Sequence, residues 1–406
     1  MNKGKAISSS EVRAQYAQHV VASYKRPDIA PVLVKGKGTK VWDAEGREYL
    51  DFGSGIAVNC LGHAHPRLAE VMKSQADELV HVSNLFFHPK QAELAKALVE
   101  RIGPGKVFFC NSGAEANEAM VKAVRKAGSS QGRYEVITTL NSFHGRTMGM
   151  IAASGQERLR EGFGPAMPGF VYVPYNDLAA IEKAIGSKTV AVMIEGIQGE
   201  GGIIPAKVEY LTGLRKLTRD KGIYLIMDSV QCGHYRTGRF QSYERILDEA
   251  KSKESFLPDA ISMAKSLGGG FPIGAVWLGE KLADVLTPGT HATTYGGTAL
   301  ACAVALEILK IIEEEKLAGN IGAMGEELKS GLTKLSGRGW VGEVRGFGGM
   351  VGVTVKGNSH AKIAEKLAQA GLLVVPAGSD VLRFLAPYNV SRKEIAEALQ
   401  KVESTL

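Results

Sequence analysis

The sequence predicts an α/β fold, in which a largely parallel sheet lies between helices and a smaller α/β unit is attached. Short apolar runs alternate with helical patterns from about residue 105 to residue 280, and a second set of short runs follows a long helical segment. Strand, helix and strand in repeated order is the pattern typical of a parallel sheet covered by helices.

Polar residues follow several of the apolar runs that we expect to form the main sheet. The runs lie at residues 107–110, 136–139, 190–194, 223–227 and 273–277. Residues 111–113 follow the first run, Glu195 follows the third, and Asp228 follows the fourth. Ligands of such sheets bind beyond the carboxyl ends of the strands, so the sequence predicts a site at this edge.

A helix is expected over residues 299–312, where Ala, Leu and Ile recur at helical spacing. Strand-like runs at residues 350–354, 372–375 and 381–384, with a closing helix after Ser391, predict the smaller unit. We therefore expect three parts, with the last boundary between about residues 295 and 330. They are an N-terminal segment (1–60) packing with the small domain, a large domain (61–300) and a C-terminal small domain (301–406).

The composition is typical of an ordinary globular protein, with 406 residues, 45% of them hydrophobic and 22% charged. The net charge of +7 comes without a long basic run, which favours anionic small molecules over nucleic acid as partners. Four scattered cysteines without CxxC spacing argue against a zinc site or disulfides, and favour a reducing cytoplasm. No apolar run has the length of a membrane helix or a signal-peptide core, so we expect no membrane association.

Lys265 lies between an apolar run and three glycines, and Asp228 ends an earlier apolar run. A lysine in a partly apolar pocket has a lowered pKa and is suited to form a Schiff base. An aspartate beside a pyridine nitrogen keeps that nitrogen protonated. Together the two residues suggest pyridoxal phosphate, although either alone is more often a solvated lysine or a helix cap.

Three further segments have both a local and a functional interpretation. The turn at residues 112–117 is either a plain N-cap or a phosphate site at a helix N-terminus. Phe143 and Arg146 either belong to a surface loop or stack on a ring and clamp a carboxylate. Glu195 and Glu200 among glycines either form a turn or belong to the site. His63 and His65 lack an acidic partner at ligand spacing, so we expect no metal there.

Taken together and in this order, the motifs resemble those of class III (subgroup II) pyridoxal-phosphate aminotransferases, over about residues 27–400. The resemblance is carried by residues 55–59, 62–66, 111–117, 143–147, 195–200, 228–231, 264–265 and 294–297. It implies fold type I, with a mostly parallel sheet of the seven-stranded type in the large domain and a small α/β domain built from both ends of the chain. It also implies pyridoxal 5'-phosphate as cofactor, a homodimer with shared active sites, and small-molecule substrates.

The same resemblance implies a role for each matching residue. Lys265 would bind the cofactor covalently and carry a proton, Asp228 would hold the ring nitrogen, and Gln231 would meet the ring hydroxyl. Cofactor contacts are also implied for Ser112, Gly113, Ala114, Phe143, Glu195, Val230 and, from the neighbouring subunit, Thr294. Arg146 would bind the donor's α-carboxylate. Arg383 would bind a carboxylate of 2-oxoglutarate and pair with Glu200 when the bound substrate does not need it.

Within this class the chain is most similar to the members that act on acetylornithine in arginine biosynthesis. Ile56 stands where members acting on free ornithine carry a tyrosine, and an apolar residue suits an acylated amine. Alternative donors are ornithine, succinylornithine, 4-aminobutyrate and lysine, and a non-catalytic homologue is the remote alternative. The chain departs from the class at Ser229, where a glutamate is usual, and at His234 and Tyr235, which could reshape the pocket or a dimer contact.

Overall fold

The computed structural model describes residues 8–24, 26–27, 29–357 and 359–406. The first seven residues of the expected N-terminal segment therefore lie outside the described residues. The main sheet has seven strands in the order β4-β12-β11-β10-β7-β5-β6. Their bounds are β4 Gly105–Cys110, β5 Glu135–Thr139, β6 Phe170–Val173, β7 Thr189–Glu195, β10 Tyr224–Asp228, β11 Ala260–Met263 and β12 Gly274–Gly279.

The expected largely parallel sheet is confirmed, and all five predicted strands are present. Only β12 runs antiparallel to its neighbours β11 and β4, and the other pairs are parallel. The carboxyl ends of β4, β7, β10 and β11 therefore meet at one edge. The apolar pattern did not predict β6, whose four residues are mostly half-buried at the edge of the sheet.

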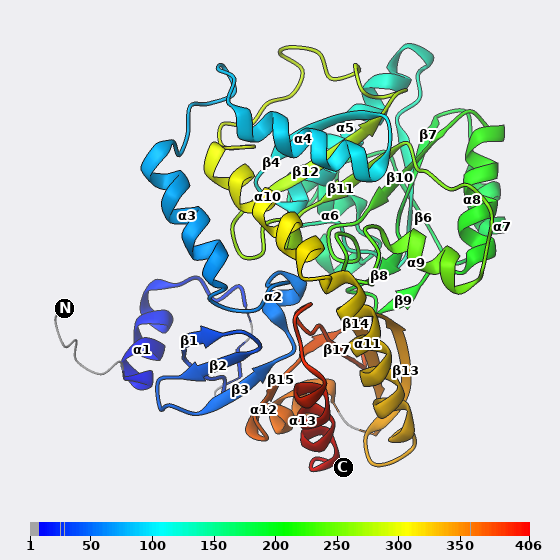
Figure 1. The fold of residues 1–406 in the computed structure, drawn as a ribbon. Helices are drawn as coiled ribbons and strands as arrows, with labels where there is room; N and C mark the ends of the chain where they lie inside the picture. Colours follow the sequence, from blue (N-terminus) through cyan, green and yellow to red (C-terminus); the bar gives the residue numbers. More distant parts are fainter. Residues whose placement is uncertain (1–7, 25, 28, 358) are drawn as a thin grey trace.

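Helices cover both faces of this sheet, as Figure 1 shows. These helices are α4 Pro89–Ile102, α5 Gly113–Gly128, α6 Met148–Ala153, α7 Leu178–Ala184, α8 Val208–Asp220, α9 Ser242–Glu249 and α10 Ala299–Glu314. The helix α3 Pro66–Glu78 lies to one side in Figure 1 and packs against α10. The central strand β7 is buried throughout and contributes to a core on each side. Val192 and Ile194 pack with residues of α4 and α8, whereas Ala191 and Met193 pack with α5. Burial on both faces explains the uninterrupted apolar run of this strand.

The smaller part combines both ends of the chain. One sheet has the order β1-β2-β3-β15, a second has β13-β14-β17-β16, and β8 pairs with β9 beside them. The strands are β1 Leu33–Lys37, β2 Lys40–Asp43, β3 Glu48–Asp51, β8 Ile197–Gln198, β9 Ile204–Pro205, β13 Val341–Phe347, β14 Met350–Val355, β15 Leu372–Leu373, β16 Val375–Ala377 and β17 Val381–Phe384. The helices are α1 Ser9–His19, α2 Ser54–Ala57, α11 Leu317–Lys334, α12 His360–Gln369 and α13 Arg392–Glu403.

Two expectations for the C-terminal part have different outcomes. The helix predicted over residues 299–312 is α10, which Thr298 caps by accepting a hydrogen bond from the Ala301 amide. The single strand predicted at residues 372–375 is wrong, because its residues divide between β15 and β16 in two sheets. β15 pairs with β3, so the two ends of the chain share a sheet. The domain boundaries themselves stay a prediction.

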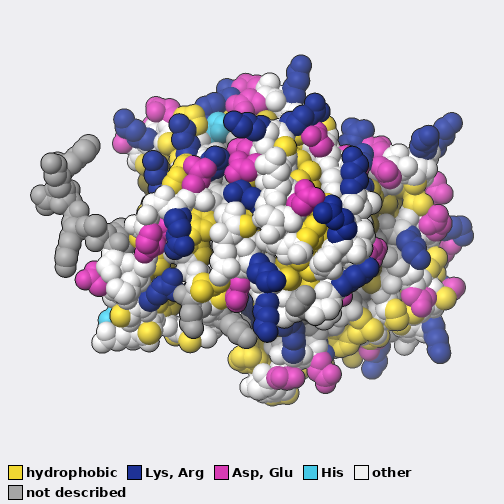
Figure 2. Space-filling view, turned by 90° about the horizontal axis from the view of Figure 1, so that it is seen from below, with side chains coloured by type: hydrophobic (Ala, Val, Ile, Leu, Met, Phe, Trp, Pro, Cys, Tyr) yellow, Lys and Arg dark blue, Asp and Glu magenta, His cyan; other side chains and the backbone are white. Residues whose placement is uncertain are grey.

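The surface carries both signs of charge. Figure 2 shows one face on which basic and acidic side chains alternate, with hydrophobic ones scattered between them. Among the described residues, no helix has the length and hydropathy that crossing a membrane requires. The same residues contain no cluster of three or more His, Cys, Asp or Glu side chains arranged to hold a metal ion.

Candidate active site

A cavity of about 400 Å³ lies at the edge of the main sheet where β4, β7, β10 and β11 end. This is the edge at which the sequence predicts a site. Eleven of the predicted site residues line it: Ser112, Gly113, Ala114, Phe143, Arg146, Glu195, Glu200, Asp228, Val230, Gln231 and Lys265. Segments from Val58 to Ile273 thus converge on one space, at the edge where ligands of such sheets bind.

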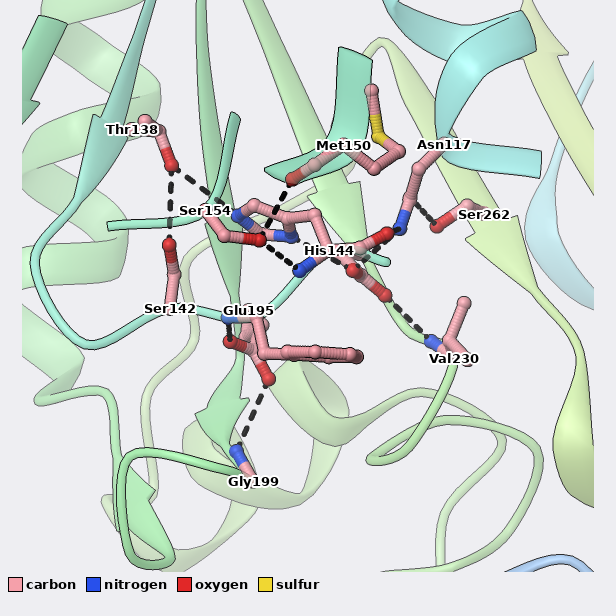
Figure 3. A network of polar contacts seen from close by, with 12 residues as sticks. Asn117, Thr138, Ser142, His144, Met150, Ser154, Glu195, Gly199, Val230 and Ser262 are labelled. Atoms are coloured by element: carbon pink, nitrogen blue, oxygen red, sulfur yellow. Dashed lines mark hydrogen bonds and ion pairs between the residues drawn. The ribbon is translucent and has the colours of Figure 1, made fainter. Parts of the chain in front are cut away.

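Asp228, the last residue of β10, is buried and has a hydrogen-bond partner on both carboxylate oxygens. Oδ2 accepts from Asn117 Nδ2 at 2.7 Å and pairs with His144 Nδ1 at 2.8 Å, and Oδ1 accepts from the Val230 amide at 2.9 Å. Figure 3 shows this network from close by. A buried carboxylate with three hydrogen-bond partners is held in one orientation.

The contacts of His144 fix which ring nitrogen carries the proton. A carboxylate only accepts, so Nδ1 donates to Asp228. Nε2 lies 3.2 Å from the hydroxyl oxygen of Thr138, which in turn lies 3.3 Å from the hydroxyl oxygen of Ser142 (Figure 3). The two contacts together hold the imidazole ring in place, with Nδ1 donating to Asp228.

Lys265 opens the short helix η3, Lys265–Leu267, directly after β11. Its φ of +48° is in the left-handed region, which side chains other than glycine rarely adopt. Burial, and next the charge of Arg383, lower the pKa of its amine to about 8. Near pH 8 this raises the neutral fraction from well under one per cent to about half, so the amine is a usable nucleophile and base.

The N-terminus of α5 faces the cavity through Ser112, Gly113 and Ala114. Ser112 caps the helix by accepting from the Glu115 amide, so the local N-cap interpretation is correct. The helix dipole and free amides also make this turn suited to a phosphate, and the two interpretations are compatible. A side chain on Gly113 would come within 2.7 Å of Val230, so only glycine fits between the turn and that cavity wall.

Glu195 ends β7 with two backbone partners. Its carboxylate accepts from the amides of Phe143 and Gly199 at 3.2 and 3.1 Å. Burial, and next the charge of Asp228, raise its pKa to about 7. The contact with Phe143 fixes the loop whose ring lines the cavity, with the guanidinium of Arg146 5.5 Å from that ring.

Arg383, on β17, lies behind the cavity wall and is 1% exposed. Its Nη1 donates to Glu200 Oε1 at 2.6 Å and to Gln231 Oε1 at 3.1 Å. The predicted pair of Arg383 with Glu200 is thus present, and Gln231 is a third member that the sequence did not assign to it. Glu200 is the more exposed partner of the ion pair, so it is the group that can move away.

Besides Arg383, two predicted residues do not line this cavity. Thr294 lines a second hollow of about 830 Å³, together with Phe87 and His291. Ile56 is 42% exposed and lies two residues before Val58, which lines the cavity.

The three departures from the class have separate environments. The Ser229 hydroxyl is buried without a hydrogen-bond partner. His234 is buried beside the rings of Tyr235 and Phe240, and burial, with the charge of Arg101 next, lowers its pKa to about 3. Neither His234 nor Tyr235 lines the cavity, so neither shapes it directly.

The sequence did not single out Asn117 or His144 as functional residues. Asn117 lies on the otherwise apolar face of α5 with Ala116 and Met120, where a polar residue needs a buried partner. The position of Asn117 on this apolar face could therefore have indicated a buried polar contact from the sequence alone. For His144 the only indication of a functional role in the sequence is its position after Phe143.

The chain belongs to the class-III aminotransferases, whose family model matches residues 21–406. A curated relative from Caldanaerobacter subterraneus, named acetylornithine aminotransferase, is 44% identical over 393 residues, covering 96% of this chain and 97% of its own. The solved N-acetylornithine aminotransferase of Stenotrophomonas maltophilia is 35% identical, with a TM-score of 0.81 and 97% coverage of both chains. The ornithine aminotransferase of Toxoplasma gondii is 33% identical, with a TM-score of 0.92 and coverage of 98% of this chain and 94% of that one.

The chain is therefore an aminotransferase of fold type I that depends on pyridoxal 5'-phosphate. The residues present fit this cofactor. The cavity offers an amine of lowered pKa at Lys265, a fixed carboxylate at Asp228, and a helix N-terminus whose Gly113 leaves room beside Val230. These three groups match the aldehyde, the ring nitrogen and the phosphate of the cofactor.

Proposed function

We propose that the protein transfers the δ-amino group of N2-acetylornithine to 2-oxoglutarate, giving N-acetylglutamate semialdehyde and glutamate in arginine biosynthesis. The observation that carries this proposal is the set of curated relatives named acetylornithine aminotransferase, which are 41–45% identical to nearly the whole chain. The solved ornithine aminotransferase quoted above is less similar in sequence, at 33% identity. The apolar, exposed side chain of Ile56 also supports an acylated donor.

Each cavity residue has a task in this reaction. The bound cofactor supplies a carbonyl carbon that receives the amino group and a ring that withdraws electrons from the reacting carbon. Asp228 would favour a proton on the ring nitrogen of the bound cofactor, and Asn117 and His144 keep its carboxylate in place. Lys265 Nζ, with its lowered pKa, would serve as the base that accepts a proton from the donor's reacting carbon.

The remaining contacts divide between cofactor and substrate. Phe143 and Val230 would lie against the cofactor ring, Gln231 would meet its hydroxyl, and residues 112–114 would hold the phosphate, since all of them line the cavity. Glu195 supports the Phe143 loop. Arg146 is exposed at the cavity and binds the donor's α-carboxylate.

The pair of Arg383 and Glu200 lets one pocket bind two substrates in turn. With the donor bound, Glu200 neutralises Arg383 as it does in the free protein. When 2-oxoglutarate binds, its carboxylate replaces Glu200 on the guanidinium, and Glu200 turns toward solvent. Such an exchange avoids leaving a buried charge without a partner at either stage.

A donor panel tests the substrate. The holoenzyme should show a higher kcat/KM for acetylornithine than for ornithine, succinylornithine, 4-aminobutyrate and lysine, each with 2-oxoglutarate as acceptor. Initial-rate patterns should be parallel, as a ping-pong cycle requires. A donor other than acetylornithine with the highest kcat/KM would replace the proposed substrate, and the aminotransferase class would stand.

We also propose that the protein is a homodimer in which Thr294 reaches the partner's cofactor phosphate. The support is an exposed apolar segment at residues 85–87, whose side chains Leu85, Phe86 and Phe87 are 87%, 68% and 106% exposed. Phe87 and Thr294 line the same hollow, so a second copy seated there would bury both. Sedimentation velocity of Phe87→Asp should show a shift to monomer, with the cofactor bound more weakly. A dimer that persists with full cofactor affinity would contradict this.

A cytoplasmic location is proposed as well. The four cysteines are buried free thiols, which a reducing compartment keeps in that state. Fractionation of the native cells with an antibody to the protein tests it, and recovery outside the cytoplasmic fraction would contradict it.

A further inference from the structure

The segment α2 is a left-handed turn beside the active-site cavity. Four consecutive residues, Ser54, Gly55, Ile56 and Ala57, have φ of +45°, +62°, +63° and +62°. Left-handed φ is usually confined to single residues, and only glycine adopts it without cost. The turn ends at Val58, which lines the cavity.

Ile56 makes this conformation especially unfavourable, because its branched Cβ clashes with the backbone at positive φ. Packing does not offset the cost, since the side chain is 42% exposed. Strained backbone persists where the surrounding structure imposes it, and such strain is concentrated at functional sites. Some other group must therefore hold the turn.

Asp51 holds the start of the turn. Its Oδ1 accepts hydrogen bonds from the amides of Gly53 and Ser54 at 3.0 and 2.8 Å. Its Oδ2 lies 2.7 Å from His63 Nε2, so the carboxylate is itself fixed from a third segment. Two backbone donors on one oxygen orient the chain as it enters the turn.

Arg236 contacts the end of the turn. Its guanidinium is fully buried, and Nη2 donates to the carbonyl of Ala57 at 3.4 Å. Nη1 donates to the carbonyls of Ala386 and Gly349 at 2.6 and 3.1 Å, which belong to the C-terminal part. Arg236 thus ties the last residue of the turn to two other segments, with its charge over the ring of Tyr388.

We propose that Asp51 and Arg236 are positioning residues that hold the left-handed turn so that Ile56 is presented to the donor's acyl group. The inference rests on the proposed function for the identity of the donor. The strain and the two anchors do not depend on it. The turn is then a specificity element whose position is set by residues that do not touch the substrate.

Asp51→Ala tests the first anchor. The ratio of kcat/KM for acetylornithine to that for ornithine should fall by about tenfold, mainly through KM for acetylornithine, while the 2-oxoglutarate half-reaction changes little. Asp51→Asn keeps the oxygen that accepts from Gly53 and Ser54 and should restore most of the ratio. The matched control is Asp43→Ala, since Asp43 also accepts from two backbone amides, but in the turn between β2 and β3.

If Asp51→Ala leaves the acetylornithine-to-ornithine ratio of kcat/KM unchanged, the proposed role of Asp51 is wrong. It is also wrong if Asp43→Ala lowers this ratio by the same factor. Arg236→Lys, which keeps the charge but loses the fork of donors, should lower the same ratio. A ratio unchanged in this variant would remove Arg236 from the proposal.

Thermal melting tests the strain without any substrate. Ile56→Gly should melt higher than Ile56→Ala, because glycine adopts left-handed φ freely. The control is Ala396→Gly on the exposed face of α13, which should lower the melting temperature. The cost of Asp51→Ala should also be smaller in the Ile56→Gly background than alone.

The kinetic measurements with acetylornithine and the melting measurements test different parts of the proposal, and either can contradict it alone. If acetylornithine is not a substrate, the proposed function fails, and the melting order of the two position-56 variants still decides whether the turn is strained. If Ile56→Gly melts lower than Ile56→Ala, the proposed strain is wrong, whatever the donor. If Asp51→Ala does not fold, two measurements still decide the proposal. They are the melting order of Ile56→Gly and Ile56→Ala, and the ratio of kcat/KM for acetylornithine to that for ornithine in Arg236→Lys.

Discussion

The network around Asp228 and the left-handed turn at residues 54–57 lie by the same cavity, but the chain builds them in opposite ways. Asp228 ends a regular parallel strand, and its side-chain hydrogen-bond partners, Asn117 on α5 and His144 in the loop after β5, are both buried. The turn joins the N-terminal sheet to the cavity, with an exposed Ile56 and an unfavourable backbone.

The difference indicates which chemistry each region serves. Cofactor chemistry needs a fixed carboxylate and amine, and regular elements with satisfied polar groups supply this. Substrate selection needs a surface that different members of one class can vary, and loops held by a few anchors supply that. Arg383 and Glu200 lie between these extremes, since one is buried and the other can move.

The largest effect is expected at Lys265, where the covalent anchor and the proton carrier are the same group. Lys265→Ala should lower turnover by at least about ten-thousand-fold, with an unchanged circular dichroism spectrum. Lys362→Ala, an exposed lysine on α12, is the control and should keep full turnover. Turnover near the wild-type value in Lys265→Ala would remove this residue from its role.

Arg383→Ala should separate the two half-reactions. We expect the 2-oxoglutarate half-reaction to slow by about a hundredfold and the amine half-reaction by much less, since only the acceptor needs the guanidinium. Stopped-flow traces of each half-reaction measure this. Arg338→Ala breaks an exposed ion pair with Glu403 and should change neither. Equal losses in both half-reactions of Arg383→Ala would contradict the assignment.

Thr138→Val should have an intermediate effect, because it removes the hydroxyl that contacts Nε2 of His144 with little change in side-chain volume. Turnover should fall by about tenfold, and the ¹⁵N shift of Nε2 of His144 in the apoprotein should change with the loss of its hydroxyl partner, while Nδ1 keeps its proton toward Asp228. Thr218→Val is the matched control, since Thr218 is buried on α8 and bonds only to helix carbonyls. Unchanged ¹⁵N shifts in Thr138→Val would show that another group fixes the ring.

The smallest expected effect concerns pH and the stability of the apoprotein. The folded pKa of Lys265 is about 8, below its ordinary value of 10.5, so the unfolded chain binds more protons between these values. Stability contributed by this group therefore rises as the pH rises from 8 to 10.5, and below pH 8 the buried charge has its full cost. Lys265→Met should melt a few degrees above wild type at pH 7, and the difference should shrink toward pH 10. A difference independent of pH would contradict the lowered pKa.

Local sequence patterns predicted the strands of the main sheet because burial on both faces leaves continuous apolar runs, as in β7. They also placed eleven site residues at one edge, since the carboxyl ends of parallel strands meet there. The split between β15 and β16 could not be predicted, because the chain changes sheets at Val374 without a glycine or proline there to mark it.

Two features of the site depend on contacts that no local pattern records. The role of His144 depends on Thr138 and Asp228, which are brought to it by different strands. The turn at residues 54–57 contains one glycine, and its other three residues normally avoid the conformation that Asp51 and Arg236 hold.

The most direct test of this account is to reduce the holoenzyme with borohydride and to map the attached cofactor by peptide mass spectrometry. The account predicts one modified residue, Lys265, in the peptide that follows β11, and no modification once the enzyme has been converted to its amine form by acetylornithine. Modification at a different lysine, or none in an enzyme that transaminates, would contradict it.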